Sequence, residues 1–519
     1  MDNPLHLSDI IRVIKRFGNK RARNLFRMRT KQNSVTRLAR KFADSEQREE
    51  ETWARDIFGE GSSSRSYVRL RSKLKLKTLS LLFDLDLQKG SELRRMMYAN
   101  MRRVFMVRVL IMLGARRAAM SLVPAALARA RKYELTSDTI ELLRLARTHA
   151  AFEGNRLAFK KIDHELSAAL RLRVAENQIA SILERFYVES VGRSTVRPSL
   201  KRLTGASLDE ATAVFEEFPT FNIGINYFRI ATTVAEVESN FALSITLCKR
   251  ASMFLKLHPH MQNKAFAGEF ALKRLTAALS ANDLVQGKSA VLECKQYFEP
   301  GGNNWFVMME YEFLLYMHTQ QFASASVCLE AVIAHGRFES QAEQVRQKWA
   351  IFQQYIVFML LAKQSTKRKT LAKLIREVPI YSKDKAGYNI SLIILQYLVL
   401  VELGKFDEVI VRSEALNQYL MRHLRTRKSG PLYAFLKSLV LLQRHDFNVQ
   451  RASVYTKRYV QRFCTGYHSV EESQVLPYPQ MWDHIITGIE RATVAHSKVR
   501  RKKGTAKRSK VGDCGESVH

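Results

Sequence analysis

Apolar residues recur along this chain mainly at three- and four-residue intervals. Beyond residue 90, stretches of about 12 to 22 residues keep this helical spacing and are joined by short turns. Most prolines fall where the spacing lapses, and the Ser-x-x-Glu spacing at Ser207 and Ser340 is typical of capped helix starts. The pattern therefore predicts an all-α protein.

One segment has a second interpretation. From Val68 to Lys77, apolar and basic residues alternate with period two, which by itself favours a half-exposed strand. Leu70, Leu74 and Leu81 also fit one helical face, and no second strand is visible to pair with the segment. We predict a helix, because a lone strand would leave its backbone donors and acceptors unpaired.

The longest uncharged stretch runs from Ala386 to Val401 and has 16 residues. This is shorter than the roughly 20 apolar residues that a helix needs to cross a bilayer. We interpret the stretch as a buried core helix and expect no transmembrane segment.

Large apolar residues recur directly after short turns, where each opens the next helix. The intervals from Met120 onward are 39, 82, 43, 38, 84 and 41 residues, and the two long ones are close to twice 41. A structural unit of about forty residues follows, with no readable anchor near residues 200 and 364. The packing anchors are Phe159, Phe241, Leu284, Phe322, Phe406 and Phe447.

These units resemble the tetratricopeptide-like helical-repeat proteins, whose second helix opens with an aromatic residue followed by small or apolar ones. The closest local matches are Leu403-Gly-Lys-Phe406 with Val409, and Gln320-Gln-Phe-Ala-Ser-Ala325. The resemblance covers roughly residues 98 to 463 and implies a right-handed solenoid of antiparallel helix pairs, a TPR-like superhelix.

The same resemblance implies peptide or protein binding along a concave surface lined by first helices. Some members of the family hold a C-terminal carboxylate there with a clamp of basic and amide side chains. The matching positions in this chain are Arg229, Thr233 and Tyr311, so the clamp is not reproduced.

The chain is strongly basic, with 84 Lys and Arg against 49 Asp and Glu, a formal charge of +35. Residues 1–150 hold 33 basic and 15 acidic side chains, and residues 10–43 hold twelve basic ones and no acid. Apolar residues interleave with this run, so part of it fits a basic amphipathic helix that binds phosphates, lies on an anionic membrane, or is simply solvated. A second basic run beyond residue 497 is typical of a disordered tail. Candidate contacts to an anionic partner are Arg12, Lys15, Arg16, Lys20, Arg21, Arg23, Arg500, Arg501, Lys502 and Lys503.

These patterns predict three regions: a basic N-terminal segment with a polar linker at 1–66, the helical solenoid at 67–495, and a basic disordered tail at 496–519. The N-terminus lacks the basic and apolar regions of a signal peptide. Five widely spaced cysteines suggest no disulfide framework, so we expect a cytoplasmic protein.

No motif of catalysis, cofactor binding or metal ligation is evident. The glycine-rich stretch from Gly59 lacks the spacing and lysine of a P-loop, and His164-Glu165 is not followed by a second histidine at zincin spacing. Cys248, Cys294 and Cys328 fall at predicted core positions, where cysteine acts as a small hydrophobe. The expected function is a non-enzymatic scaffold, without cofactor, that binds a protein or peptide. The alternative is a basic helical-repeat protein that binds RNA or DNA through phosphate contacts.

Overall fold

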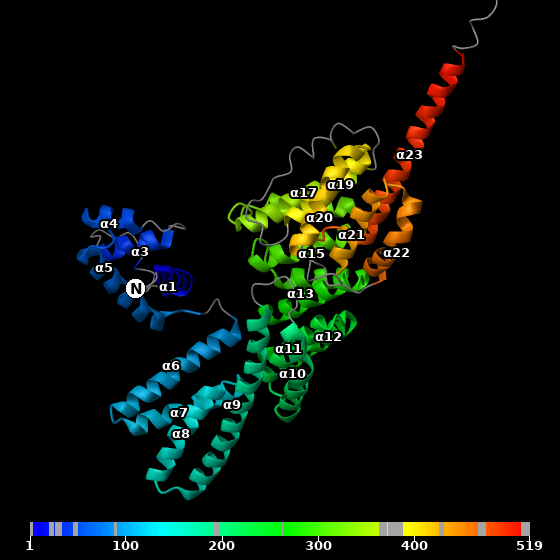
Figure 1. The fold of residues 1–519 in the computed structure, drawn as a ribbon. Helices are drawn as coiled ribbons and strands as arrows, with labels where there is room; N and C mark the ends of the chain where they lie inside the picture. Colours follow the sequence, from blue (N-terminus) through cyan, green and yellow to red (C-terminus); the bar gives the residue numbers. More distant parts are fainter. Residues whose placement is uncertain are drawn as a thin grey trace, which may run out of the picture. The chain divides into compact units, whose positions relative to one another are not determined.

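The computed structural model describes residues 4–19, 25, 34–44, 50–87, 91–190, 198–261, 263–362, 371, 388–424, 430–465 and 474–509. Within these ranges the fold is all-α, as predicted, with 21 α-helices, two 3₁₀ turns and no strand (Figure 1). One isolated β-bridge joins Gly18 and Leu85.

The chain divides into two compact units. Unit 1 comprises residues 1–178, 220–222 and 258–263, and unit 2 comprises 179–219, 223–257 and 264–519. The helices of unit 1 are α1 (Pro4–Phe17), α3 (Ser34–Asp44), α4 (Glu50–Phe58), α5 (Arg65–Leu81), η2 (Leu82–Asp84), α6 (Glu92–Met112), α7 (Arg116–Lys132), α8 (Thr136–Phe152), most of α9 (Arg156–Ser190) and η3 (Pro259–Met261). Unit 2 contains α10 (Pro198–Glu217), most of α11 (Phe221–Val237), α12 (Phe241–Leu257), α13 (Lys264–Ser280), α14 (Leu284–Tyr297), α15 (Asn303–His318), α16 (Phe322–Ile333), α17 (Glu343–Ala362), α19 (Tyr388–Leu403), α20 (Phe406–His423), α21 (Pro431–Arg444), α22 (Val449–Thr465) and α23 (Tyr478–Ser509).

Helices α1, α3, α4 and α5 share one small hydrophobic core. Ile11, Phe42 and Leu74 are buried in it, and Phe42 packs edge-to-face against Trp53 with ring centroids 4.9 Å apart. Within the segment expected to be a polar linker, residues 50–58 thus form α4, because Trp53 and Ala54 supply an apolar face.

Helix α5 confirms the helical interpretation of residues 68–77. Ser64 caps it by accepting a hydrogen bond from the Tyr67 N–H at 3.2 Å. Leu70 and Leu74 are buried, whereas Val68 and Leu76 are exposed on another face. The period-two pattern arises because this helix carries apolar side chains on both its core face and its solvent face.

Consecutive helices pack against one another through much of each unit. In unit 1, α7 packs on both α6 and α8; in unit 2, contacts join α12 to α13 to α14, α15 to α16 to α17, and α19 through to α22. Helix α23 packs on α19, α21 and α22, where the Arg491 guanidinium pairs with the Glu402 carboxylate at 3.0 and 2.9 Å.

The turns between paired helices share one backbone conformation. In each, a residue with positive φ donates its N–H to the carbonyl three residues earlier, and the next residue donates to the carbonyl five earlier, the pattern of a Schellman motif. For example, Gln320 has φ 58° and donates to Met317, while Gln321 donates to Tyr316 at 2.9 Å. Eight turns follow this rule; their positive-φ residues are Gly114, Glu134, Gly154, Ser239, Asn282, Gln320, Gly404 and Asp446.

Four of the predicted anchors occupy one structural position. Phe241, Leu284, Phe322 and Phe406 are each the first residue of a helix, two positions after the positive-φ residue. The other two differ: Phe159 is the fourth residue of α9 and is 36% exposed, and Phe447 lies in the turn before α22 with φ 57°.

Several local predictions are wrong. Helices of about 12 to 22 residues were expected, but α9 and α23 have 35 and 32 residues. Helix α9 therefore continues to Ser190 without a Schellman turn. Ser207 lies inside α10, and the Ser340 hydroxyl donates to the Arg337 carbonyl instead of capping α17. Helix α23 also extends to residue 509 across the segment expected to be a tail, while 510–519 lie outside the described residues.

From Tyr388 onward the uncharged stretch lies in α19, whose residues from Leu392 to Val401 are almost all buried, as predicted for a core helix; residues 386 and 387 lie outside the described residues. Among the residues that the structure describes, no helix is both long enough and apolar enough to span a membrane.

The shared turn conformation generates a stability prediction. A left-handed backbone costs an L-residue about 1 kcal/mol or more relative to glycine, so Gln320→Gly is expected to raise the thermal unfolding midpoint of the full chain. Gly404→Ala is the matched opposite change: an added Cβ at Gly404 (φ 72°) meets no atom within 4 Å, so its cost is conformational only. A lower midpoint for Gln320→Gly, or an unchanged one for Gly404→Ala, measured by calorimetry, would contradict this account.

Candidate functional site: the first-helix ladder

In unit 2, the first helices of successive pairs are more deeply buried than the second helices. Most positions of α11, α13 and α15 are buried or half-buried, whereas α12, α14 and α16 expose apolar side chains such as Leu243, Leu292 and Val327. The first helices therefore have only a narrow line of half-buried positions available for polar side chains. Charged residues on this line form the first-helix ladder: Arg229, Glu236, Glu269, Lys273, Glu310 and Lys348.

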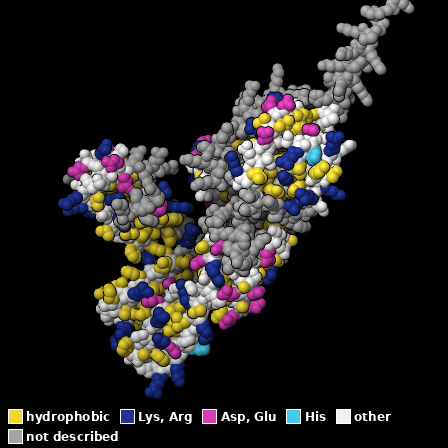
Figure 2. All heavy atoms as spheres, viewed as in Figure 1, with side chains coloured by type: hydrophobic (Ala, Val, Ile, Leu, Met, Phe, Trp, Pro, Cys, Tyr) yellow, Lys and Arg dark blue, Asp and Glu magenta, His cyan; other side chains and the backbone are white. Residues whose placement is uncertain are grey.

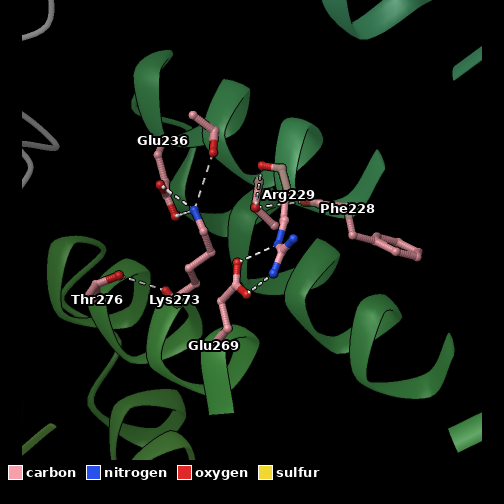
Figure 3. A network of polar contacts seen from close by, with 8 residues as sticks. Phe228, Arg229, Glu236, Glu269, Lys273 and Thr276 are labelled. Atoms are coloured by element: carbon pink, nitrogen blue, oxygen red, sulfur yellow. Dashed lines mark hydrogen bonds and ion pairs between the residues drawn. The ribbon is translucent and has the colours of Figure 1, made fainter. Parts of the chain in front are cut away.

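The strongest contact of the ladder joins α11 to α13. The Arg229 Nε donates to Glu269 Oε1 at 2.8 Å and its Nη2 donates to Oε2 at 2.6 Å, a bidentate pair (Figure 3). Burial acts to lower the pKa of Arg229, but the hydrogen bonds and charge of Glu269 outweigh it and raise that pKa. The guanidinium also lies over the Phe266 ring, 5.3 Å from its centroid.

A second contact lies further along the same two helices, two turns after Arg229 on α11 and one turn after Glu269 on α13. The Lys273 ammonium is 3.2 and 3.1 Å from the two Glu236 carboxylate oxygens and 3.4 Å from the Thr233 hydroxyl (Figure 3). The charges alternate, with cation and anion on α11 facing anion and cation on α13. This arrangement sets the register of the two helices, since a shift by one turn would oppose like charges.

The ladder continues between α15 and α17, where Lys348 Nζ donates to Glu310 Oε1 at 2.8 Å. The partners in all three contacts are 37 to 40 residues apart in sequence. Unit 1 contains the same kind of contact between α6 and α8, from Asn100 to Asp138 at 2.9 Å. Side chains one structural unit apart therefore meet repeatedly along the chain.

Two of the three positions expected to correspond to a carboxylate clamp are used internally. The Arg229 guanidinium is paired with the Glu269 carboxylate, and the Thr233 hydroxyl accepts a hydrogen bond from Lys273. Tyr311 is half-buried on α15. A peptide carboxylate would have to displace Glu269 to reach the Arg229 guanidinium, so the ladder does not offer an open anion site.

The candidate contacts to an anionic partner are placed as follows. On α1, Arg12 is 3.7 Å from the Asp9 carboxylate, Lys15 donates to the Ala43 carbonyl, and Arg16 lies over the Phe17 ring. Lys20, Arg21 and Arg23 lie outside the described residues, and Arg500, Arg501, Lys502 and Lys503 belong to the helical backbone of α23, where side chains are not described.

The three predicted core cysteines are buried as expected. Burial raises the pKa of Cys248 and of Cys294 to about 12, and it also raises the pKa of Cys328, so these thiols are poor nucleophiles at neutral pH. Within the described residues, no group of three or more His, Cys, Asp or Glu side chains could hold a metal ion.

One open hollow of about 400 Å³ lies at the turn between α6 and α7. It is lined by Arg116, Arg117, His149 and Glu153, and the Arg116 guanidinium lies 4.3 Å from the centroid of the Phe152 ring.

In comparisons with known proteins, no protein-family model, no curated protein and no solved structure matches the chain.

The sequence pattern identified Arg229 and Thr233 as first-helix positions that match a carboxylate clamp, but it did not identify their partners. The interval of about forty residues between structural units would have found these partners, if it had also been used to compare charged positions. Glu269 follows Arg229 by 40 residues, and Lys273 follows Thr233 by 40 residues.

The ladder generates a charge-swap prediction. Arg229→Glu places a carboxylate opposite Glu269 in a half-buried setting, and we expect a loss of about 1–3 kcal/mol in the free energy of unfolding. The double variant Arg229→Glu/Glu269→Arg restores opposite charges and should recover at least half of the loss, which a double-mutant cycle by denaturant unfolding measures. Additive effects of the two single changes would show that the pair does not couple α11 to α13.

Proposed function

We propose that this protein is a non-enzymatic helical-repeat scaffold of the tetratricopeptide-like type that binds a protein or peptide partner. Its helix pairs would stack as a right-handed solenoid, with the first helices lining the binding surface. The observation that carries the proposal is the recurrence of contacts between first helices at an interval of about forty residues, from Asn100–Asp138 to Lys348–Glu310.

Packing in unit 2 supports a stacked array. Each described helix from α13 to α23 contributes buried residues to one hydrophobic cluster, and most of these helices pack against their neighbours in sequence. Arrays of this type present long surfaces to extended partners. The function is assigned by analogy with that architecture.

The aromatic residues beside the ladder are the best candidates for contact with a partner. Phe266 on α13 and Tyr311 on α15 are both half-buried. Aromatic side chains in partly covered positions are enriched among residues that dominate binding energy.

The alternative function is binding of RNA or DNA through phosphate contacts. One observation favours it: α1 buries Ile11 and Ile14 in its core, which leaves Arg12 and Arg16 exposed on the outer face. Binding of this kind would weaken steeply as the salt concentration rises.

The scaffold proposal is tested by recovery of partners from native lysate after chemical crosslinking and nuclease treatment. We expect the full chain to recover one defined protein repeatedly. Phe266→Ala/Tyr311→Ala should reduce that recovery at least fivefold, because it truncates two side chains on the first helices.

Leu243→Ala/Leu292→Ala is the matched control, because it truncates two exposed side chains on the second helices α12 and α14. Equal losses for both double variants would place binding elsewhere. Repeated recovery of no defined protein would overturn the scaffold, and recovery that disappears with nuclease would favour the nucleic-acid alternative.

A further inference from the structure

Helix α6 exposes a stripe of large apolar side chains along a face next to its core-forming face. Met97, Met101, Phe105 and Met112 follow one another at helical spacing, and Met101, Phe105 and Met112 are 60%, 52% and 76% exposed. Other positions of α6, including Val104 and Val107, are buried in the hydrophobic core that α6 shares with α7, α8 and α9. The exposed stripe is therefore an addition to the core-forming face of α6.

The apolar surface continues from α6 onto η2 and α5. The Phe83 ring packs against the Phe105 ring with centroids 5.5 Å apart, and the Tyr98 hydroxyl donates to the Leu82 carbonyl at 2.8 Å. Leu79 lies one turn before Phe83, and Leu76, on the same face of α5, is 71% exposed. Figure 2 shows apolar side chains gathered over this region of unit 1. We define the α5–α6 surface as Leu76, Leu79, Phe83, Met97, Met101 and Phe105.

The helices that carry this surface are almost free of acidic residues. Helix α5 has six Lys and Arg and no Asp or Glu, and α6 has five Arg and one Glu. That Glu92 accepts a hydrogen bond from the Tyr133 hydroxyl at 2.7 Å. Lys73 and Lys77 on α5 and Arg102 on α6 are exposed beside the apolar side chains.

The composition of the surface favours one class of occupant. Methionine side chains adapt to different partner shapes and are frequent where proteins bind amphipathic helices. A row of apolar side chains bordered by cations is complementary to a helix with an apolar face and acidic flanks.

We propose that the α5–α6 surface is a docking site for an amphipathic, acidic helix of a partner protein. The inference rests on the proposed scaffold function and adds to it a second site, in unit 1, with a stated partner chemistry. The apolar face of the partner would lie along Met97, Met101 and Phe105, and its carboxylates would face the neighbouring Lys and Arg side chains.

A displayed library of helical 18-residue peptides, selected on the full chain, tests this docking site. We expect enriched peptides with leucine-like residues at i, i+3, i+4 and i+7 and with Asp or Glu on both flanks. In fluorescence anisotropy with the best synthetic peptide, Met101→Ser/Phe105→Ser should weaken binding at least tenfold. The double charge reversal Lys73→Glu/Lys77→Glu should weaken it at least threefold and reduce its salt dependence.

Leu292→Ser is the control for the α5–α6 surface, because it makes an equally polar change at a 66% exposed leucine of unit 2 and should leave the affinity within twofold. Circular dichroism checks that every variant remains folded. The double variants of the first helices should also bind the peptide normally, so failure of this site is separable from failure of the scaffold proposal.

Three results would overturn the docking site. One is the absence of enrichment, or enrichment of peptides without acidic flanks. Another is binding to vesicles of phosphatidylserine and phosphatidylcholine that depends on Met101 and Phe105 while no peptide is selected, which would make the surface a membrane contact. The third is self-association in analytical ultracentrifugation that is lost in Met101→Ser/Phe105→Ser, which would make the occupant a second copy of the chain.

Discussion

The fold depends on helices that cannot bury their apolar side chains without neighbours on more than one side. In α19, successive residues from Leu398 to Val401 are almost completely buried, so an isolated helix or a single hairpin would leave much of this surface in water. Each additional helix pair removes apolar surface from water, and this burial stabilises the fold by roughly 25 cal/mol per Å². Cooperative stacking in sequence order is therefore a physical requirement of the chain, and the shared turn conformation supplies the chain reversal that makes it possible.

The first-helix ladder adds specificity to this apolar packing. Hydrophobic contact is nearly non-directional and would tolerate α13 displaced by a turn against α11. The pairs Arg229–Glu269 and Lys273–Glu236 oppose such a shift, because a displacement of one turn would bring Arg229 opposite Lys273 in one direction, or Glu236 opposite Glu269 in the other. Because ion pairs of this kind add little net stability, their main effect is on register, which in turn fixes the spacing of any residues that contact a partner.

The sequence predicted the helical class because helical periodicity and turns are local properties. Phe241, Phe322 and Phe406 were identifiable because each follows a turn of constant length, and the structure places all three at helix starts. The partners of Arg229 and Thr233 were not predicted, because only the packing of α11 against α13 brings residues 40 positions apart together. The length of α9 was not predicted for a related reason: the spacing indicated helices of about 12 to 22 residues, and nothing local shows that this helix continues to Ser190.

The exposed face of α6 follows from the same requirement for neighbours. In stacked helical arrays, a helix without a neighbour on one side needs a polar outer surface to remain soluble. Helix α6 opens the series α6 to α9 and instead presents Met101, Phe105 and Met112 to solvent. Its flanking arginines compensate in part by keeping the surface charged, but they do not cover the apolar side chains. A chain that buries apolar stripes between its own helices thus presents a similar stripe where the series begins, and the proposed partner helix would bury it by the same packing physics.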